Sequence, residues 1–182
     1  MYINSLIINN LRNHEHSETD FSEGLNIIYG ANGEGKTTML EAISICSYSK
    51  SFLSAADSSL IRNGSGYYFI STQCENDLGI QYKISIKYTQ GSKKLISSSH
   101  GDNLLPKDII GELPLVALSP DYRAISSGSP QDRRQFIDRL LSQASRIYIE
   151  SLMNCNRTLK QRNMLLSDAK IKGYYDKSQL QG

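Results

Sequence analysis

The sequence predicts an α/β protein, in which a mixed β-sheet that includes antiparallel strands precedes an α-helical region. Three observations predict this fold class. A glycine-rich turn at residues 30–37 lies between a short apolar run and a run with helical spacing. Apolar and polar residues alternate from Ile80 to Tyr88, the period of a strand with one face in water. No glycine or proline occurs between Pro130 and Gly173, which favours long helices.

The first third of the chain is predicted to form two strands and a helix. The β-rich run at 5–11 and the apolar run at 24–29 are each expected to be a strand. The glycine-rich turn follows the second run. The segment 37–46 then places apolar residues at helical spacing, namely Met39, Leu40, Ala42, Ile43 and Cys46.

The middle third is predicted to contain a hairpin. Its strands are 67–75 and 80–88, and the link at 76–79 has the composition of a tight turn. Three further segments are assigned from their composition: serine-rich loops at 47–66 and 91–101, and a buried strand at 113–118.

The last third is predicted to be helical. Ser129 can cap a helix, Pro130 suits the first helical position, and Asp132 stands where a capping-box acid would be. The pattern fits one long helix or a helical hairpin. From Arg123 to Gly182 there are eleven Lys and Arg against five Asp and Glu. Such a basic region can bind along a polyanion, or it can be the solvated face of a helix.

The turn at 30–37 matches the phosphate-binding P-loop motif GxxxxGK[ST] in full, as Gly30, Ala31, Asn32, Gly33, Glu34, Gly35, Lys36 and Thr37. Glycines let several backbone N–H groups point into one concavity that holds the β- and γ-phosphates. Lys36 would reach the same phosphates, and the Thr37 hydroxyl would coordinate Mg²⁺. We therefore expect ATP and Mg²⁺ as cofactors. The plain alternative is a glycine-rich strand-to-helix turn that binds nothing.

No complete catalytic set is visible, so no catalytic residue is assigned. ATP hydrolysis by this class needs a strand that ends in Asp, usually with a neighbouring Glu. The segment 115–121 ends in Asp121, but a proline precedes it and no Glu follows. The segment 127–131 is faintly similar to the LSGGQ signature of ABC-type ATPases, although a helix cap explains it better. We expect negligible hydrolysis by this chain alone.

Several short blocks, in order, resemble the N-terminal half of the RecF family, SMC/ABC-like ATPases of bacterial recombinational repair. The resemblance covers essentially the whole chain. The blocks are Leu11-Arg12-Asn13, the P-loop with 38–43, Lys50-Ser51-Phe52, Ser119-Pro120-Asp121, Gly128-Ser129-Pro130 with 133–138, and Leu159-Lys160-Gln161-Arg162-Asn163. This chain departs from the family pattern at Leu11, where the family usually has Phe, and at Leu53, where it usually has Arg.

The resemblance implies an ABC/SMC-type ATPase head lobe over residues 1–122 and the start of a helical lobe over 123–182, truncated. It also implies DNA repair, DNA replication and the SOS response as the setting. The partners implied are DNA, either duplex or single-strand/double-strand junctions, and a RecR-type mediator protein. An ATP-dependent homodimer and slow DNA-dependent ATP hydrolysis are implied for the full-length form. The catalytic and signature motifs of such proteins lie in their C-terminal half.

Further candidates for the nucleotide site are Thr38, after the P-loop, and the pair Arg12 and Asn13, after the first strand. The resemblance implies that the loop with Arg12 and Asn13 can reach the nucleotide, while a surface turn is the alternative. Candidate residues for DNA contact or for coupling of the lobes are Lys50, Arg62, Arg133 and Arg134. The two histidines of the early turn, His14 and His16, are expected at the surface.

The bulk properties fit a cytoplasmic protein without a membrane segment. No apolar run approaches the length of a membrane helix, and the first residues do not resemble a secretory signal. The three cysteines are widely spaced, which favours a reducing compartment. Two other functions remain open: a P-loop phosphotransferase that acts on a small molecule, and a non-catalytic fragment that serves only as an interaction surface.

Overall fold

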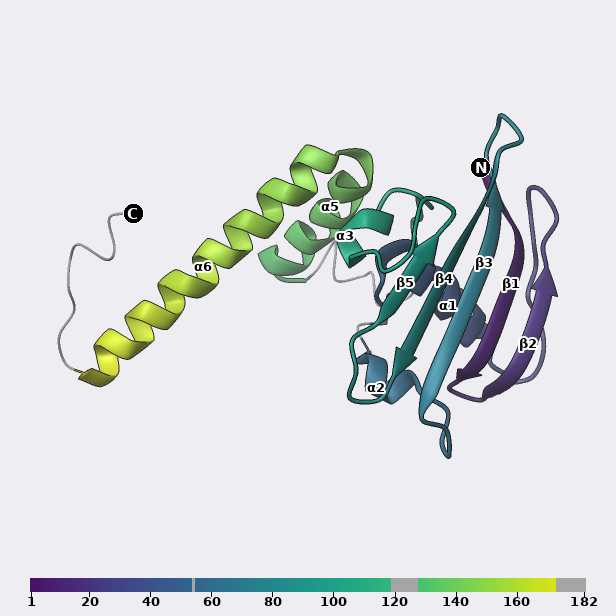
Figure 1. The fold of residues 1–182 in the computed structure, drawn as a ribbon, viewed down its shortest axis with the longest axis horizontal. Helices are drawn as coiled ribbons and strands as arrows, with labels where there is room; N and C mark the ends of the chain where they lie inside the picture. Colours follow the sequence, from purple (N-terminus) through teal and green to yellow (C-terminus); the bar gives the residue numbers. More distant parts are fainter. Residues whose placement is uncertain (54, 119–127, 173–182) are drawn as a thin grey trace. The chain divides into compact units, whose positions relative to one another are not determined.

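The computed structural model describes residues 1–53, 55–118 and 128–172, which fall into two compact units, Met1–Pro120 and Asp121–Gly182. The first unit is built on a five-stranded sheet with the order β2-β1-β3-β4-β5. Every pairing in it is antiparallel. The strands are β1 (Tyr2–Leu11), β2 (His14–Asp20), β3 (Tyr67–Glu75), β4 (Gln81–Thr89) and β5 (Leu95–Ser98). The P-loop helix α1 (Lys36–Tyr48) lies against one face of the sheet (Figure 1).

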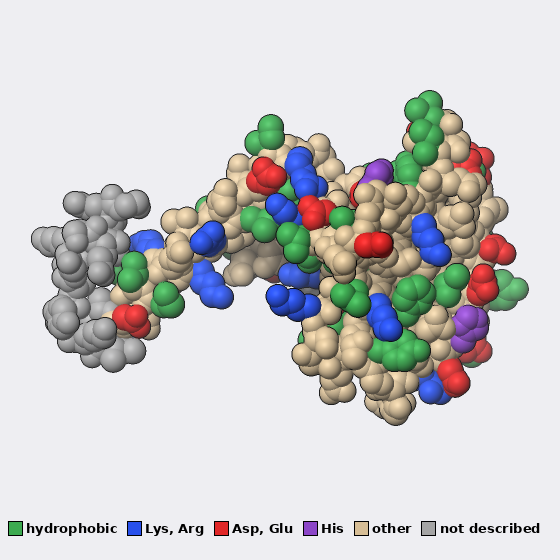
Figure 2. All heavy atoms as spheres, viewed as in Figure 1, with side chains coloured by type: hydrophobic (Ala, Val, Ile, Leu, Met, Phe, Trp, Pro, Cys, Tyr) green, Lys and Arg blue, Asp and Glu red, His purple; other side chains and the backbone are tan. Residues whose placement is uncertain are grey.

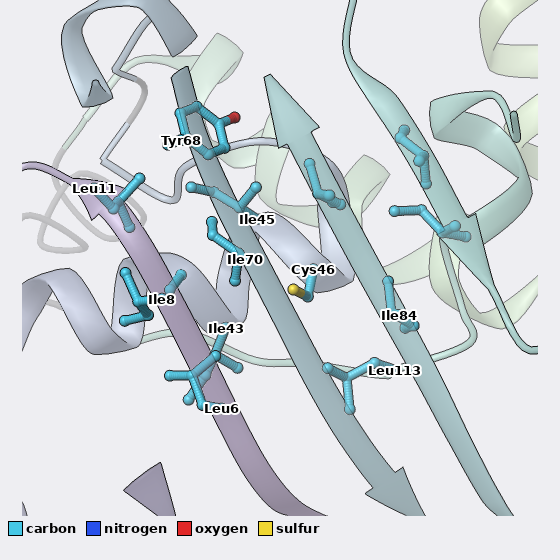
Figure 3. Packing of buried hydrophobic residues seen from close by; sticks show 14 of the residues in the cluster. Leu6, Ile8, Leu11, Ile43, Ile45, Cys46, Tyr68, Ile70, Ile84 and Leu113 are labelled. Carbon is cyan, nitrogen blue, oxygen red and sulfur yellow. The ribbon is translucent and has the colours of Figure 1, made fainter. Parts of the chain in front are cut away.

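The core lies between this face and α1. Alternate strand residues, among them Leu6, Ile8 and Ile70, are almost completely buried. They meet Ile45 and Cys46 of α1, which are also fully buried (Figure 3). This packing fixes the helix against the sheet, and therefore fixes the loop that precedes the helix.

The opposite face of the sheet is exposed to solvent on β2 and β4 and half-buried on β1. Glu18 and Asp20 of β2 are exposed on it, and acidic side chains gather over this edge of the sheet (Figure 2). On β4 the exposed residues include Lys83 and Lys87. The alternation of buried and exposed residues that the sequence predicts for this strand is confirmed.

A polar network at the C-terminal end of α1 joins it to the neighbouring elements. Lys94 Nζ, just before β5, lies 2.7 Å from Asp57 Oδ1 and donates to Ser49 O at 2.6 Å. Asp57 opens the short helix α2 (Asp57–Leu60) and accepts from the Tyr68 hydroxyl at 2.7 Å. Burial raises the pKa of the Tyr68 hydroxyl, and the hydrogen bond to Asp57 adds to the rise. A second short helix, α3 (Pro106–Ile109), also packs near α1.

The second unit contains α5 (Pro130–Ala144) and α6 (Arg146–Lys172), separated at Ser145. Of the two helical arrangements that the sequence allows, the structure has the two-helix one. The predicted capping box at the start of α5 is confirmed, because Ser129 N donates to Asp132 Oδ2 at 2.8 Å and Asp132 N donates to Ser129 Oγ at 3.3 Å. The Tyr148 hydroxyl donates to Asp138 Oδ1 at 2.6 Å and links the two helices.

Five segments differ from the sequence prediction, and one of them is α2, which lies within the predicted loop at 47–66. The runs 24–29 and 113–118 are not strands, and the described sheet is antiparallel rather than mixed. A strand needs a hydrogen-bonding neighbour, and none of the described strands pairs with either run. The strands β2 and β5 are additional, and they form the two edges of the sheet. The boundary predicted after residue 122 lies outside the described residues. None of the helices in the described ranges is long and apolar enough to cross a membrane.

Candidate nucleotide-binding site

The P-loop forms a turn that ends at the first residue of α1. Gly30, Gly33 and Gly35 have φ values of 150°, 90° and 91°. Gly35 is the N-cap residue, and its carbonyl accepts the first helical bond from Met39 N at 3.1 Å. The first N–H groups of a helix have no partner within it, and the helix dipole places partial positive charge there. The turn therefore presents donors and a positive potential on one side, as an anion site requires.

The Lys36 side chain crosses this turn. Its Nζ donates to Gly30 O at 2.9 Å and to Ala31 O at 2.6 Å. Glu34 closes the loop by accepting from Ala31 N at 2.8 Å. Gly30 has a φ of 150°, which residues with a Cβ atom rarely adopt, so the backbone conformation favours glycine here. The ammonium group is thus held at the loop, where it would meet the phosphates of a bound nucleotide.

The turn between β1 and β2 holds the P-loop from outside. Asn13 Nδ2 donates to Gly33 O at 2.6 Å, and its Oδ1 accepts from the buried Thr38 hydroxyl at 3.4 Å. His14 Nε2 lies 3.1 Å from Gly35 O. A Cβ atom on Gly35 would lie 2.1 Å from this nitrogen, so the imidazole approaches the backbone closely where glycine, with a φ of 91°, leaves room for it. Sequence reasoning placed His14 at the surface, whereas the structure has it half-buried against the P-loop.

Arg12 contacts a buried carboxylate instead of the P-loop backbone. Its Nε donates to Glu41 Oε2 at 2.5 Å and its Nη2 to Glu41 Oε1 at 2.9 Å. Ser51 Oγ also donates to Glu41. The Glu41 side chain is 1% exposed, although it belongs to α1. The hydrogen bond to Glu41 raises the pKa of Arg12, against an opposing effect of burial.

The structure brings together part of the predicted site. Residues 30–38 and Asn13 form one cluster, and Thr37 is exposed at its rim. Arg62 lies beside the β1–β2 turn, where its Nη2 is 3.0 Å from Glu15 Oε2. Lys50 is exposed just after α1.

Two other predicted residues belong to the second unit. Arg133 and Arg134 are exposed on α5 in the second unit, and Arg133 Nη1 donates to Gly128 O at 3.0 Å. Asp121, which ends the weak candidate for a catalytic strand, lies outside the described residues.

Sequence reasoning missed two residues of this region, His14 and Glu41. Glu41 carries a weak signal, because a lone carboxylate on the apolar side of a helix is rarely buried without a partner. His14 carries none, since its partner lies 21 residues further along the chain.

The residues present fit a nucleoside triphosphate with its metal ion. The glycine-rich turn, the helix N-terminus and the Lys36 ammonium supply donors and positive charge for phosphate oxygens. The Thr37 hydroxyl is exposed at the first turn of α1, next to Lys36, and an oxygen ligand of this type suits Mg²⁺.

Comparisons with known proteins agree with this arrangement. A family model described as an AAA domain matches residues 5–180. The DNA replication and repair protein RecF of Chlorobium phaeovibrioides is 36% identical over 182 residues, which is all of this chain and 49% of that protein. RecF of Leptospira interrogans is 39% identical over 168 residues, 91% of this chain and 46% of that protein. The chain thus spans about half the length of the curated relatives it matches.

Two solved structures resemble this chain in fold. The structure of the recombination mediator protein RecF with ATP, from the RecFOR pathway, superimposes with a TM-score of 0.89 at 30% identity, over 98% of this chain and 48% of that one. A solved structure of an SMC ATPase superimposes with a TM-score of 0.62 at 22% identity, over 77% of this chain and 99% of that one. The second likeness concerns the fold alone. The predicted ATPase head-lobe fold class is confirmed, with the correction to the sheet given above.

Proposed function

Because this chain belongs to the AAA domain family, and because its P-loop has the geometry of an anion site, we propose that it binds ATP and Mg²⁺ at residues 30–38 as part of a RecF-like DNA repair protein. The observation that carries the proposal is the loop itself: a turn with three glycines at positive φ leads into α1, and Lys36 lies across it. The similarity to a RecF structure with ATP over 98% of the chain supports the choice of nucleotide.

Each polar group of the loop has a separate task in this proposal. Lys36 exchanges its bonds to Gly30 O and Ala31 O for bonds to the β- and γ-phosphates. Thr37 supplies a hydroxyl to Mg²⁺. The N–H groups at the start of α1 bind phosphate oxygens. Arg12 remains a candidate for the nucleotide, but its guanidinium would first have to leave Glu41, which would lose its charged partner.

The test is a titration of the chain with ATP and Mg²⁺ beside two single-lysine variants. Lys36→Ala removes the charged donor at the loop, and we expect its affinity for ATP to fall by roughly 100-fold or more. Lys93→Ala is the matched control, because Lys93 is exposed in the turn between β4 and β5. Equal affinity of all three proteins would contradict a site at the P-loop.

The role of the metal ion is tested separately. Thr37→Val keeps the shape of the side chain and removes its hydroxyl. We expect this variant to bind ATP alone as the wild type does, and to lose most of the gain that Mg²⁺ gives the wild type. An unchanged response to Mg²⁺ would remove Thr37 from the metal site.

We further propose that the second unit contributes to DNA binding. Arg133 and Arg134 of α5 are exposed, as are Arg157, Lys160 and Arg162 of α6. Phosphate contacts by such residues make the affinity for DNA fall steeply with salt. Replacing the three cations of α6 by Gln is expected to lower both the affinity and the slope of its salt dependence. Unchanged binding would make this surface a solvated helix face only.

The finer parts of the proposal concern the longer relatives. The RecF structures belong to a RecFOR pathway, and we propose a RecR-type mediator protein as a partner of the full-length form. We also propose that two such full-length proteins pair on DNA when they bind ATP. Slow hydrolysis of the ATP would then release them from the DNA. Analytical ultracentrifugation with and without ATP tests the pairing, and a sedimentation coefficient independent of ATP would count against it.

A further inference from the structure

His14 has no task in the nucleotide chemistry proposed above, yet it contacts the P-loop. It is the first residue of β2, and its side chain is half-buried. Its Nε2 lies 3.1 Å from Gly35 O. A carbonyl oxygen only accepts hydrogen bonds, so a hydrogen bond at this contact requires a proton on Nε2. His16, on the same strand, is exposed and contacts Asn9 Oδ1 at 2.7 Å instead.

The partner of His14 shares a peptide group with Lys36. All described peptide bonds are trans, so the Gly35 carbonyl and the Lys36 N–H point in opposite directions. A donor that holds the carbonyl on one side therefore directs the N–H toward the other. The Lys36 N–H is the first of α1, and N–H groups at this position are those that bind phosphate in a P-loop.

The peptide needs an external anchor because glycine lets it rotate. Rotation of the peptide between Gly35 and Lys36 changes ψ of Gly35 and φ of Lys36, and at Gly35, with a φ of 91° and a ψ of 15°, no Cβ atom restricts the change in ψ. Within the helix, only Met39 N contacts the Gly35 carbonyl, at 3.1 Å, and the terminal bonds of helices fray. The contact from His14 comes from the sheet, which does not fray with the helix.

The turn that carries His14 is itself firmly held. Its flanking residues Leu11 and His14 pair in the sheet, and Arg12 N donates to Leu60 O at 2.7 Å. Asn13 Nδ2 donates to Gly33 O at 2.6 Å, so the same turn fixes a second carbonyl of the loop. One rigid turn thus determines the direction of two peptide groups in the P-loop.

We propose that His14 is a positioning residue, which holds the Gly35 carbonyl so that the Lys36 N–H faces the phosphates before the nucleotide arrives. The proposal rests on the proposed function, namely that residues 30–38 hold a triphosphate. Removal of the donor lets the peptide sample other orientations. Affinity for ATP should then fall roughly 3- to 10-fold, the effect of one neutral hydrogen bond.

The experiment compares three variants of the whole chain with the wild type. His14→Phe keeps an aromatic ring and removes the donor, whereas His14→Gln keeps a side-chain N–H at similar reach. His16→Phe is the matched control on the same strand. ATP affinity is measured for all four, with thermal unfolding as a check of folding. We expect weaker binding for His14→Phe, affinity near that of the wild type for His14→Gln, and no change for His16→Phe.

A second measurement needs no nucleotide and separates this proposal from the proposed function. The ¹⁵N shifts of the imidazole report which ring nitrogen carries the proton, and we expect Nε2–H for His14. We also expect the Lys36 amide resonance to move in His14→Phe and to return in His14→Gln. A proton on Nδ1 only, or an unmoved Lys36 amide, would overturn the positioning role even if ATP binds. Failure of the wild type to bind ATP, with these signals as expected, would instead overturn the proposed function.

Discussion

The contact between Arg12 and Glu41 should contribute measurably to the stability of the first unit. Glu41 is 1% exposed, and it accepts from Arg12 Nε at 2.5 Å, from Arg12 Nη2 at 2.9 Å and from Ser51 Oγ. Arg12→Leu removes both guanidinium bonds and leaves a buried carboxylate whose remaining hydrogen-bond donor, among the described residues, is Ser51 Oγ. Breaking a buried ion pair costs about 3–5 kcal/mol. The Arg12 side chain is 36% exposed, so water can replace part of the lost interaction, and we expect about 2–4 kcal/mol.

Urea unfolding followed by far-UV circular dichroism measures this loss through the shift in the midpoint. Glu41→Gln added to Arg12→Leu should restore about half of it, since a neutral amide needs no counter-charge. Arg62→Leu is the matched control, because its partner Glu15 is 75% exposed, and it should change stability by less than about 1 kcal/mol. The reasoning is refuted if Arg12→Leu costs no more than Arg62→Leu, or if the double variant is less stable than Arg12→Leu alone.

Three further predictions concern separate sites. Hydrogen bonds from Ser129 lower the pKa of Asp132, so the stabilisation is present above the ordinary carboxyl pKa and is lost as the pH falls through the lowered one. The helical circular dichroism signal should therefore decline below about pH 4, and this acid-induced decline should be smaller in Asp132→Ala. An identical decline in both proteins would contradict a stabilising cap formed by Ser129 and Asp132. Burial raises the pKa of the Cys46 thiol, whereas Cys155 is exposed, so mass spectrometry should find maleimide on Cys155 on the order of 100-fold sooner. Equal labelling would mean that the core opens readily. Glu34→Gln keeps an acceptor for the Ala31 N–H and removes a negative charge beside the phosphates of a bound nucleotide. The affinity for ATP should therefore rise roughly two- to fivefold at low salt, and by less at high salt, where the charge is screened. Weaker binding would mean that the carboxylate itself is required.

Features set by local chemistry were predictable from the sequence. The P-loop, α1 and the hairpin of β3 and β4 each follow from neighbouring residues, and β3 has the predicted bounds. The start of α5 is another example, because the Ser129 and Asp132 side chains act on the backbone within three residues.

Features set by distant partners were not predictable. The run at 24–29 has the apolar pattern of a strand, but Leu25, Ile27 and Tyr29 are 84%, 75% and 89% exposed, and no described strand pairs with it. The polar sequence of β2 gives no strand signal, because an edge strand with one solvated face needs few apolar residues.

Within the site, the sequence predicted the loop and Asn13, but not the partners of Arg12 and His14. The contacts of Arg12 and His14 reach residues 29 and 21 positions away in the sequence, and the residues adjacent to either one in the sequence do not predict these partners. Their partners are a carboxylate and a backbone carbonyl, which only the packing of α1 against the sheet brings within reach.

The most direct test of the central claim is to map ATP binding residue by residue. The ¹⁵N-labelled chain is titrated with ATP and Mg²⁺, and the amide resonances are followed by NMR. Binding at the P-loop predicts saturable shifts that are largest for residues 33–38 and absent in Lys36→Ala. Shifts that centre elsewhere, for example on the exposed face of the sheet, or that persist unchanged in Lys36→Ala, would contradict a nucleotide site at this loop.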